Sequence, residues 1–432
     1  PRYRVTRGEQ RLTCGRANTL RLALSSQLGP DAFTSEAMYD TLDLCVSCKG
    51  CRRDCPTGVD MAKMKVEFLA HYKATHGYSL KDRLIARLPD YAHVASRFAW
   101  LLNLRDRLPG AARLSERWMG LSARRTLPRW RGDTFWRTND SANHDANGSA
   151  RSDKLFASRE ETLAAAAAGG KAAVLFVDTF NGVFESENAW AAARALKAAG
   201  YALHMVTKDA GHYCCGRTYL ASGMVEEAKL KARALIDALL PFANAGIAIV
   251  GLEPSCLLTL RDEALVMGLG EPAEIVAKHA LLFEEFVARE SKTGRFALAF
   301  KASGAPVLLH GHCHQKAFGA VSPILDVLRL IPDANPALIE SSCCGMAGSF
   351  GYEAKHYEVS MRMAEADLLP AVRRQPDAIV VADGTSCRHQ IFDGAQRGAI
   401  HVALLLDRLI DVPARDAHGA RSSGIQSPSN VR

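Results

Sequence analysis

Four cysteines in residues 45–56, which read CVSCKGCRRDCP, have the clearest chemical potential in this sequence. They follow the spacing C-x2-C-x2-C-x3-C-P. Iron–sulfur clusters need soft thiolate ligands on a tight loop, and this spacing wraps three thiolates around one cubane cluster. In two-cluster ferredoxins, the fourth cysteine of such a run ligates the other cluster. A zinc ribbon would instead need two separated C-x2-C pairs. The run therefore predicts iron–sulfur ligands of the [4Fe-4S] type at Cys45, Cys48, Cys51 and Cys55.

A second set of cysteines occurs twice, each time as a CCG triplet followed by one later cysteine. Such internal symmetry predicts two duplicated domains that face each other and present cysteines from loops at strand ends. Adjacent cysteines are poor partners for each other, but both can reach one cluster, and the glycine lets the backbone come close. The first copy consists of Cys214, Cys215, Gly216 and Cys256, and the second of Cys343, Cys344, Gly345 and Cys387.

The two copies are not equivalent. HGHCH (310–314) directly follows a predicted strand, whereas the corresponding place in the first copy reads DTFN (178–181) and has no cysteine. A cluster normally takes four protein ligands. We therefore predict one cluster in the second copy, whose ligands are Cys313, Cys343, Cys344 and Cys387. Within the same motif, His312 and His314 could ligate, donate hydrogen bonds to ligands or cap a helix.

The first copy has only three cysteines, so Cys214, Cys215 and Cys256 are possible metal ligands that cannot complete a set of four unaided. On this interpretation the first copy serves mainly as a lid on the second. The alternative is that the two copies pool their cysteines around a shared site at a pseudo-two-fold interface.

Residues 1–121, which must position the first cysteine run, read as a small α-helical module. Amphipathic segments occur at 18–28 and 34–44. After the cysteine run, apolar residues recur at helical spacing, with Asp60 available as N-cap and Gly77 at the end. No strand is expected in this module.

From Ser158 the pattern alternates between strands and helices. Ser158 and Glu161 form a capping box before an alanine-rich turn. Alternating strands and helices predict a parallel sheet covered on both faces. Three strand–helix units occur twice, which gives one α/β domain at 158–295 and another at 296–412. The expected strands are 174–178, 202–206, 246–250, 306–310, 337–340 and 378–382.

Between these modules lies a basic segment and polar linker, residues 122–157. Arginines and tryptophans are interleaved over 105–137, and residues 138–153 are polar and rich in Gly, Ser and Asn. The basic stretch fits docking to an acidic partner or a membrane surface, or a solvated or interdomain surface. Residues 413–432 are expected to be a disordered tail.

Composition excludes some classes of function. The formal net charge of +8 comes without any nucleic-acid recognition motif, so no nucleic acid is expected as partner. The cysteines are grouped rather than dispersed through a short chain, which is typical of metal ligation in a reducing compartment. No apolar run of about 18 residues and no signal peptide occur. We expect a cytoplasmic protein, with peripheral contact at the inner face of the membrane and a homo-oligomer left open.

These motifs together resemble those of the cysteine-rich iron–sulfur proteins. That group includes the iron–sulfur subunits of glycolate oxidase and anaerobic glycerol-3-phosphate dehydrogenase, and the cysteine-rich subunit of heterodisulfide reductase. The closer resemblance is to the C-terminal part of fused FAD-linked dehydrogenases of D-2-hydroxy acids, of the D-lactate and D-2-hydroxyglutarate kind. The resembling stretches are GRANTLRLALS (15–25), the cysteine run with TGVDMAKMK (57–65), LEPSC (252–256), HGHCHQKA (310–317), CCGMAGSFGYE (343–353) and ADGTSCRHQI (382–391).

In that family an FAD domain and a first ferredoxin cysteine run ending in Cys-Pro precede this region. The sequence begins at Pro1, so the resemblance implies a piece cut after that run, with FAD on the preceding part or on a partner. The first three cysteines of 45–56 would then lack their fourth ligand here. Cys14 stands where the family tends to have arginine, and is expected to be a non-ligand thiol. Thr259 and Gln390 replace the fifth cysteine of each heterodisulfide reductase half.

The resemblance implies an electron-transfer role. Electrons from the hydroxy acid would reach the FAD, pass through the clusters of this chain, and leave to a quinone or another carrier. Two alternatives remain from other classes. One is a thiol–disulfide reductase like heterodisulfide reductase, and the other is a structural module whose cysteines bind zinc and dock the dehydrogenase domain.

Overall fold

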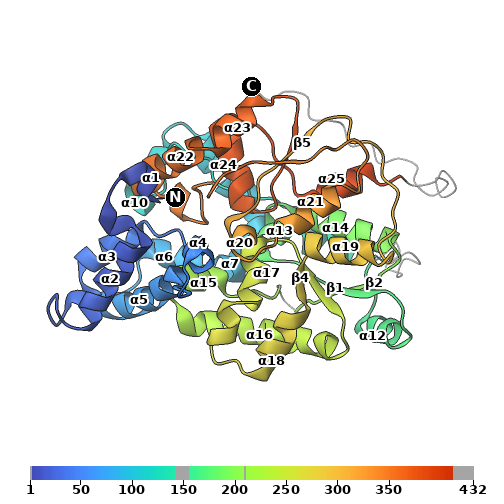
Figure 1. Cartoon of the computed structure of the whole chain (residues 1–432), viewed down its shortest axis with the longest axis horizontal. Helices are drawn as coiled ribbons and strands as arrows, with labels where there is room; N and C mark the ends of the chain where they lie inside the picture. The colour runs from blue at the N-terminus through green and yellow to red at the C-terminus, as the bar shows by residue number, and fades with distance from the viewer. Residues whose placement is uncertain (1, 143–154, 209–210, 412–432) are drawn as a thin grey trace.

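The computed structural model describes residues 2–142, 155–208 and 211–411. A helical N-terminal part packs beside two α/β parts, and each α/β part has a small parallel sheet (Figure 1). We call residues 155–295 the first half and residues 296–411 the second half. The expected tail at 413–432 lies outside the described residues, as does most of the polar stretch 138–153. Within the described ranges, no helix combines the length and apolar character needed to cross a membrane.

All regular elements described between residues 2 and 119 are helices, as predicted. Asp60 caps α5, since its carboxylate accepts hydrogen bonds from the amides of Ala62 and Lys63, and the helix ends at Gly77 with a φ of +78°. The α-helices of the N-terminal part are α1 (Arg2–Thr6), α2 (Thr13–Leu24), α3 (Glu36–Asp43), α4 (Gly50–Asp54), α5 (Met61–His76), α6 (Leu80–Ala86), α7 (Leu88–Ala95), α8 (Ala99–Leu102), α9 (Leu104–Arg107), α10 (Ala111–Met119) and α11 (Phe135–Ala142).

The first half contains a four-stranded parallel sheet in the order β2-β1-β3-β4. Its three expected strands are present, and the predicted capping box at Ser158 begins α12. The fourth strand, β4, was not expected, because its three residues merge into the following helical pattern. The elements are α12 (Arg159–Ala167), β1 (Ala172–Phe176), α13 (Thr179–Val183), α14 (Ser186–Ala198), β2 (Ala202–Met205), α15 (Arg217–Ala221), α16 (Val225–Asn244), β3 (Ala248–Gly251), α17 (Pro254–Leu260), α18 (Glu271–His279), β4 (Ala280–Leu282) and α19 (Phe283–Lys292).

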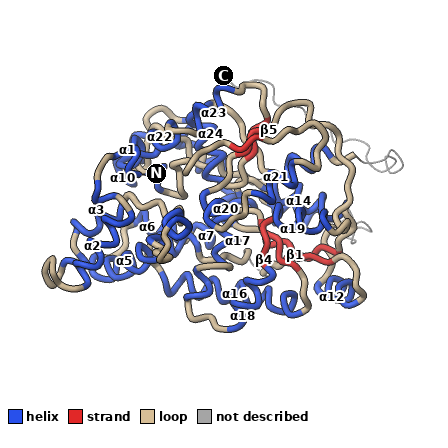
Figure 2. The backbone as a smooth tube through the Cα atoms, viewed as in Figure 1, coloured by secondary structure: helices blue, strands red, loops and turns tan. Residues whose placement is uncertain are grey.

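The second half contains a three-stranded parallel sheet in the order β6-β5-β7, so its first strand is again central. Figure 2 shows the strands of the two halves as short red segments among the blue helices. All three strands were expected, although each is shorter than predicted. The elements are β5 (Val307–Leu309), α20 (Cys313–Ala317), α21 (Ser322–Leu328), β6 (Ala337–Leu338), α22 (Tyr357–Glu365), α23 (Leu368–Arg374), β7 (Ile379–Val381), α24 (Thr385–Ala395) and α25 (Val402–Leu409).

Alternate residues of β1 pack into different cores, because successive side chains of a strand point to opposite faces. Leu175 belongs to a core with α14 and α19, whereas Val174 belongs to a core with α16 and α18. The first of these cores continues into the second sheet through Leu309 of β5 and through α21 and α25. The two halves therefore share one apolar core. On the opposite faces, the cores include Cys215 and Cys256 in the first half, and Cys344 and Cys387 in the second.

The segment 120–137 contacts both halves and so links them. Arg125 is 2% exposed and donates hydrogen bonds to the Gly351 carbonyl at 3.1 Å and the Ser360 hydroxyl at 3.0 Å, both in the second half. Trp136 stacks on His212 of the first half, with ring centroids 4.2 Å apart. This favours the interdomain interpretation of the basic stretch. Helix α11 extends to residue 142, beyond the point where the linker was expected to begin.

Candidate metal centre

The cysteine-bearing loops follow the carboxyl ends of the strands in both sheets. The loop after β2 carries the first CCG triplet, and α17 after β3 carries Cys256. In the second half, α20 after β5 begins at Cys313, the loop after β6 carries the second triplet, and α24 after β7 carries Cys387. This edge of an open parallel sheet is where loops from neighbouring strands gather. The sheet order thus explains why cysteines far apart in sequence meet.

The four second-half thiols form a chain of contacts, which we call the second-half centre. Cys313 interacts with Cys343, Cys343 with Cys344, and Cys344 with Cys387. The contact with Cys343, followed by burial, raises the pKa of Cys313. Contact with Cys313 lowers the pKa of Cys343, but contact with Cys344 and burial raise it to about 12. Burial and neighbouring thiols both disfavour the negatively charged thiolate form. These thiols therefore become thiolates only when a cation stabilises the negative charge, as at a metal site.

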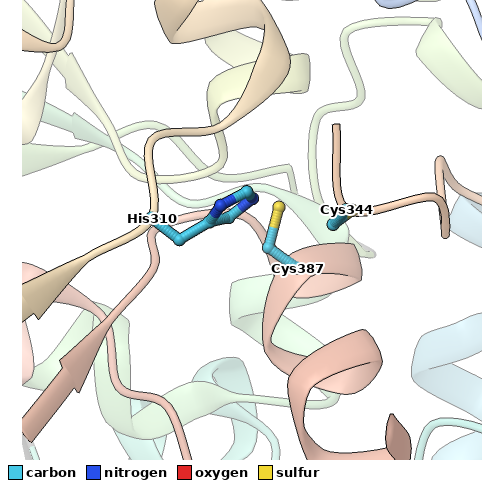
Figure 3. A group of neighbouring side chains, drawn as sticks. All are labelled: His310, Cys344 and Cys387. Carbon is cyan, nitrogen blue, oxygen red and sulfur yellow. The ribbon is translucent and has the colours of Figure 1, made fainter. Parts of the chain in front are cut away.

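His310 is a member of this site that sequence reasoning passed over. Its ring lies with Cys344 and Cys387 so that one nitrogen and the two sulfurs are within 4.8 Å of one another (Figure 3). The motif HGHCH drew attention to the two later histidines. The available signal for His310 was its position immediately after the apolar strand β5, where the polypeptide enters the cysteine edge of the sheet.

The other two histidines of the motif have structural partners. His312 caps α20, because its Nδ1 accepts a hydrogen bond from the His314 amide at 3.2 Å. Its Nε2 lies 4.0 Å from the Cys313 sulfur. His314 Nε2 lies 3.0 Å from the carbonyl oxygen of Ser47, in the first cysteine run. Of the roles considered for these residues, His312 fits both helix capping and a hydrogen bond to the Cys313 sulfur, and His314 joins two cysteine loops.

The first half gathers Cys214, Cys215 and Cys256 into a separate buried group. Contact with Cys215, followed by burial, raises the pKa of Cys214. Where the second half has Cys313 at the first position of α20, the first half has Thr179 at the first position of α13, preceded by the N-cap Asp178. The Asp178 carboxylate is committed to capping α13, since it accepts hydrogen bonds from the Phe180 amide at 2.9 Å and from the Asn181 side chain at 2.7 Å.

The first half also positions the helix that carries Cys387. Glu253, near the start of α17, accepts a hydrogen bond from the Thr385 amide at 2.9 Å, at the first position of α24. The Arg388 guanidinium, on the same helix, pairs with Glu185 of the first half. Carboxylates of one half therefore fix the N-terminal turn of a cysteine-bearing helix in the other.

Both CCG glycines permit close backbone approach, as predicted. Gly216 and Gly345 have φ of +86° and +88°. A Cβ at Gly216 would lie 2.6 Å from the Ala228 carbonyl oxygen, and one at Gly345 would lie 2.3 Å from that of Ser360. In each half the amide of this glycine also points at the first sulfur of the pair, with N···S distances of 3.3 Å and 3.4 Å.

The first cysteine run brings Cys45, Cys48 and Cys51 together, and it does not bring Cys55 to them. Burial raises the pKa of Cys51, and the nearby Cys48 and Cys45 raise it further. The thiol of Cys55 is exposed to solvent. The Thr57 hydroxyl lies 3.1 Å from the Cys55 sulfur, and this contact lowers the pKa of Cys55. The structure thus brings three of the four predicted ligands together, and all four remain predictions as ligands.

Arg16 is a second residue near the thiols that sequence reasoning did not single out. Burial lowers its pKa, whereas the nearby Cys45 and Cys48 raise it. Its Nε donates to the Thr41 carbonyl at 3.1 Å, and its buried Nη2 has no hydrogen-bond partner among the described residues. An unpaired buried donor beside three thiols is suited to a sulfur acceptor. Cys14 is exposed, in keeping with the expectation of a non-ligand thiol.

The first cysteine run lies directly against the second-half centre. Burial raises the pKa of Cys48 to about 11, and the proximity of Cys313 is the next contribution. The nearby Cys48 also raises the pKa of Cys343. The intervening Lys49, 1% exposed, forms buried ion pairs with Asp262 and Glu263 of the first half, the latter at 2.8 Å. The cysteine run is thereby locked to both halves.

The donor sets fit sulfur-rich metal clusters. The first cysteine run offers half-buried sulfur donors with the unpaired Arg16 Nη2 beside them, and the second-half centre offers mostly buried sulfurs with the unpaired His310 Nε2 beside them. All twelve cysteines are free, so no disulfide competes for the thiols. The His310 group, with one nitrogen and two sulfurs, would also suit zinc.

Comparison with known proteins supports the duplicated cysteine-rich architecture. A family model described as "Cysteine-rich domain", CCG, matches residues 184–261 and again residues 307–392. The two matches carry the two CCG triplets and the later cysteine of each copy.

Related proteins are dehydrogenases, or parts of them, by name. The chain is 25% identical to D-2-hydroxyglutarate dehydrogenase of Escherichia coli over 83% of this chain and 33% of that protein. It is 24% identical to the enzyme of the same name from Pantoea ananatis, over 90% of this chain and 37% of that protein. It is 26% identical to a subunit of the anaerobic glycerol-3-phosphate dehydrogenase of Escherichia coli, over 84% of this chain and 87% of that protein. The chain thus spans about a third of the D-2-hydroxyglutarate dehydrogenases and most of the glycerol-3-phosphate dehydrogenase subunit. It contains two CCG cysteine-rich domains and is homologous to D-2-hydroxyglutarate dehydrogenase and to this subunit of anaerobic glycerol-3-phosphate dehydrogenase.

Proposed function

We propose that this chain is the iron–sulfur electron-transfer part of an FAD-linked D-2-hydroxyacid dehydrogenase. It would receive electrons from a flavin on a fused or separate dehydrogenase domain and deliver them to a quinone or another carrier. The names of the relatives support an oxidoreductase of this kind. When bound, [4Fe-4S] clusters supply one-electron redox chemistry. The role of the polypeptide is to hold the sulfur ligands, bury them and bring the two sites together.

The observation that carries the proposal is the contact between the two thiol sites. Cys48 of the first run lies beside Cys313 and Cys343 of the second-half centre, and all three are largely shielded from solvent. Electron transfer slows steeply with the distance between redox centres, so adjacent buried sites suit a relay. A purely structural zinc module would not require this adjacency.

The finer architecture belongs to the same proposal. Residues 1–121 would be a ferredoxin-like module with Cys45, Cys48, Cys51 and Cys55 as ligands, joined by 122–157 to the two halves. The halves, 158–295 and 296–412, would be pseudo-symmetric CCG domains. Support comes from the central first strand of each sheet and from the matching geometry of the two CCG glycines.

The first test is the metal content and redox behaviour of the anaerobically purified chain. We expect broad visible absorbance that photochemically reduced FAD bleaches and a water-soluble quinone restores, with iron and sulfide but little zinc. A colourless, zinc-loaded protein would establish the structural alternative. Bleaching that is restored only by a disulfide substrate would favour the thiol–disulfide reductase.

The second test locates the cluster in the CCG region. Cys387→Ala should remove a cluster signal from the electron paramagnetic resonance (EPR) spectrum, whereas Cys256→Ala should leave that signal intact. Both cysteines are buried at equivalent positions of the two copies, so each variant controls for the other. Equal loss of iron from both variants would mean that the halves pool their ligands, and the one-sided assignment would be wrong.

A further inference from the structure

One ring nitrogen of His310 has a hydrogen-bond partner, and the other has none among the described residues. His310 is 1% exposed and lies at the carboxyl end of β5. Its Nδ1 lies 3.0 Å from the Ser341 hydroxyl, whereas its Nε2 has no hydrogen-bond partner among the described residues. Buried polar atoms without partners are few in native proteins, and each one asks for an explanation. Figure 3 shows the ring directed toward the sulfur of Cys387, with Cys344 next to it.

The hydrogen bonds around Ser341 indicate which ring nitrogen carries the proton. The Lys316 ammonium donates to the Ser341 hydroxyl oxygen at 3.3 Å and also to the Ser341 carbonyl. With a cation donating to its oxygen, the hydroxyl is free to donate its own proton to His310 Nδ1. In the neutral imidazole, the nitrogen opposite an accepting one bears the hydrogen. The network therefore places an N–H group on Nε2, facing the sulfurs.

We propose that His310 donates a hydrogen bond from Nε2 to the sulfur atoms at Cys344 and Cys387, and that Ser341 and Lys316 fix its orientation. This inference rests on the proposed cluster at the second-half centre. Hydrogen bonds to the sulfurs are among the factors that set the reduction potential of an iron–sulfur cluster. Because such a bond stabilises the more negative, reduced state, His310 should raise the potential of this cluster.

The corresponding position of the first half carries no donor. His310 lies two residues before His312, the N-cap of α20, and the residue two positions before Asp178, the N-cap of α13, is Phe176. A phenylalanine side chain has no hydrogen-bond donor. At this position, a sulfur-directed donor is therefore found in the half with four cysteines and not in the other.

The test compares His310→Phe and His310→Gln with the wild-type chain, all purified anaerobically with their clusters. Iron and sulfide per chain should be unchanged in both variants. In an EPR-monitored redox titration, His310→Phe should shift the reduction equilibrium of the Cys387-dependent cluster about tenfold toward the oxidised state, or about 59 mV for one electron. His310→Gln keeps an N–H donor and should recover part of the shift. Ser341→Ala should shift the potential in the same direction by less.

The outcomes separate this inference from the proposed function. Loss of iron in His310→Phe, together with strong nitrogen coupling in the wild-type EPR spectrum, would make His310 a ligand and overturn the donor role. An unchanged potential in His310→Phe would overturn it as well. A matched control is His204→Gln, which changes a half-buried histidine in β2 and should leave the potential unaltered. If the wild-type chain has no cluster that depends on Cys387, the proposed function fails before the His310 comparison begins.

Discussion

The close packing of the second CCG triplet can be tested by adding a single methyl group. In Gly345→Ala the new Cβ would lie 2.3 Å from the Ser360 carbonyl oxygen and 3.1 Å from Met363 Cβ, both on the buried face of α22. Gly348→Ala is a matched control. It also changes a glycine with positive φ, +61°, but its Cβ would meet nothing within 4 Å.

The two substitutions share one cost and differ in another. An L-residue in the left-handed region costs roughly 1 kcal/mol, so both variants should lose about that much stability. Only Gly345→Ala must also move α22 or the CCG loop, and overpacking of this kind costs about 1–3 kcal/mol. We therefore expect destabilisation of about 2–4 kcal/mol for Gly345→Ala and about 1 kcal/mol for Gly348→Ala.

Guanidinium unfolding of the metal-free chain, followed by far-UV circular dichroism, would measure the two losses, and iron per chain would measure ligand placement. Because the displaced loop carries Cys343 and Cys344, Gly345→Ala should also retain less iron. Equal stability and equal iron content in the two variants would show that the glycine is not required by the approach to Ser360.

Three further changes test other contacts. Lys49→Met should destabilise the chain by about 3 kcal/mol in urea unfolding, near the low end for a broken buried ion pair, because Asp262 keeps Lys63 as a partner at 2.7 Å; no loss would mean that the Lys49 pairs are dispensable. Arg16→Met should lower the potential of the cluster at the first cysteine run without loss of iron, which a redox titration would measure, and an unchanged potential would contradict a sulfur-directed Nη2. Although burial opposes it, Arg388 lowers the pKa of Glu185 to about 2, so the stability from this pair is complete above the ordinary carboxyl pKa and is lost as pH falls toward 2. Glu185→Gln should flatten the acid limb of a plot of unfolding free energy against pH, and an unaltered limb would refute the assignment.

The sequence predicted the elements well where local patterns are strong. Six strands, the Asp60 cap and the Ser158 capping box all follow from short-range periodicity and capping chemistry. The strand β4 was missed because three apolar residues, 280–282, carry no period of their own before a helix begins. Its position depends on pairing with β3, which is a tertiary property.

The site was predictable only in part, for a related reason. Cysteine spacing indicates which thiols are candidate ligands, because loops of fixed length follow each strand. It does not reveal the partners that come from elsewhere in the fold. His310 was missed because its role depends on Ser341, and Arg16 because it reaches Cys48 across the helical part. The contact of Cys48 with the second half likewise follows from docking of whole modules, which local sequence does not encode.

The core shared by the two sheets bears on how such a chain can change over generations. Leu175 in β1 and Leu309 in β5 belong to the same apolar cluster, so neither half can be discarded without exposing the interior of the other. Selection can therefore relax on the ligands of the first half while remaining strict on its folding. The half with three cysteines is held in the fold by the apolar surface that it buries against its neighbour. For protein engineering, the shared core means that the two halves should be transferred together. The half with three cysteines is the better place to introduce new chemistry.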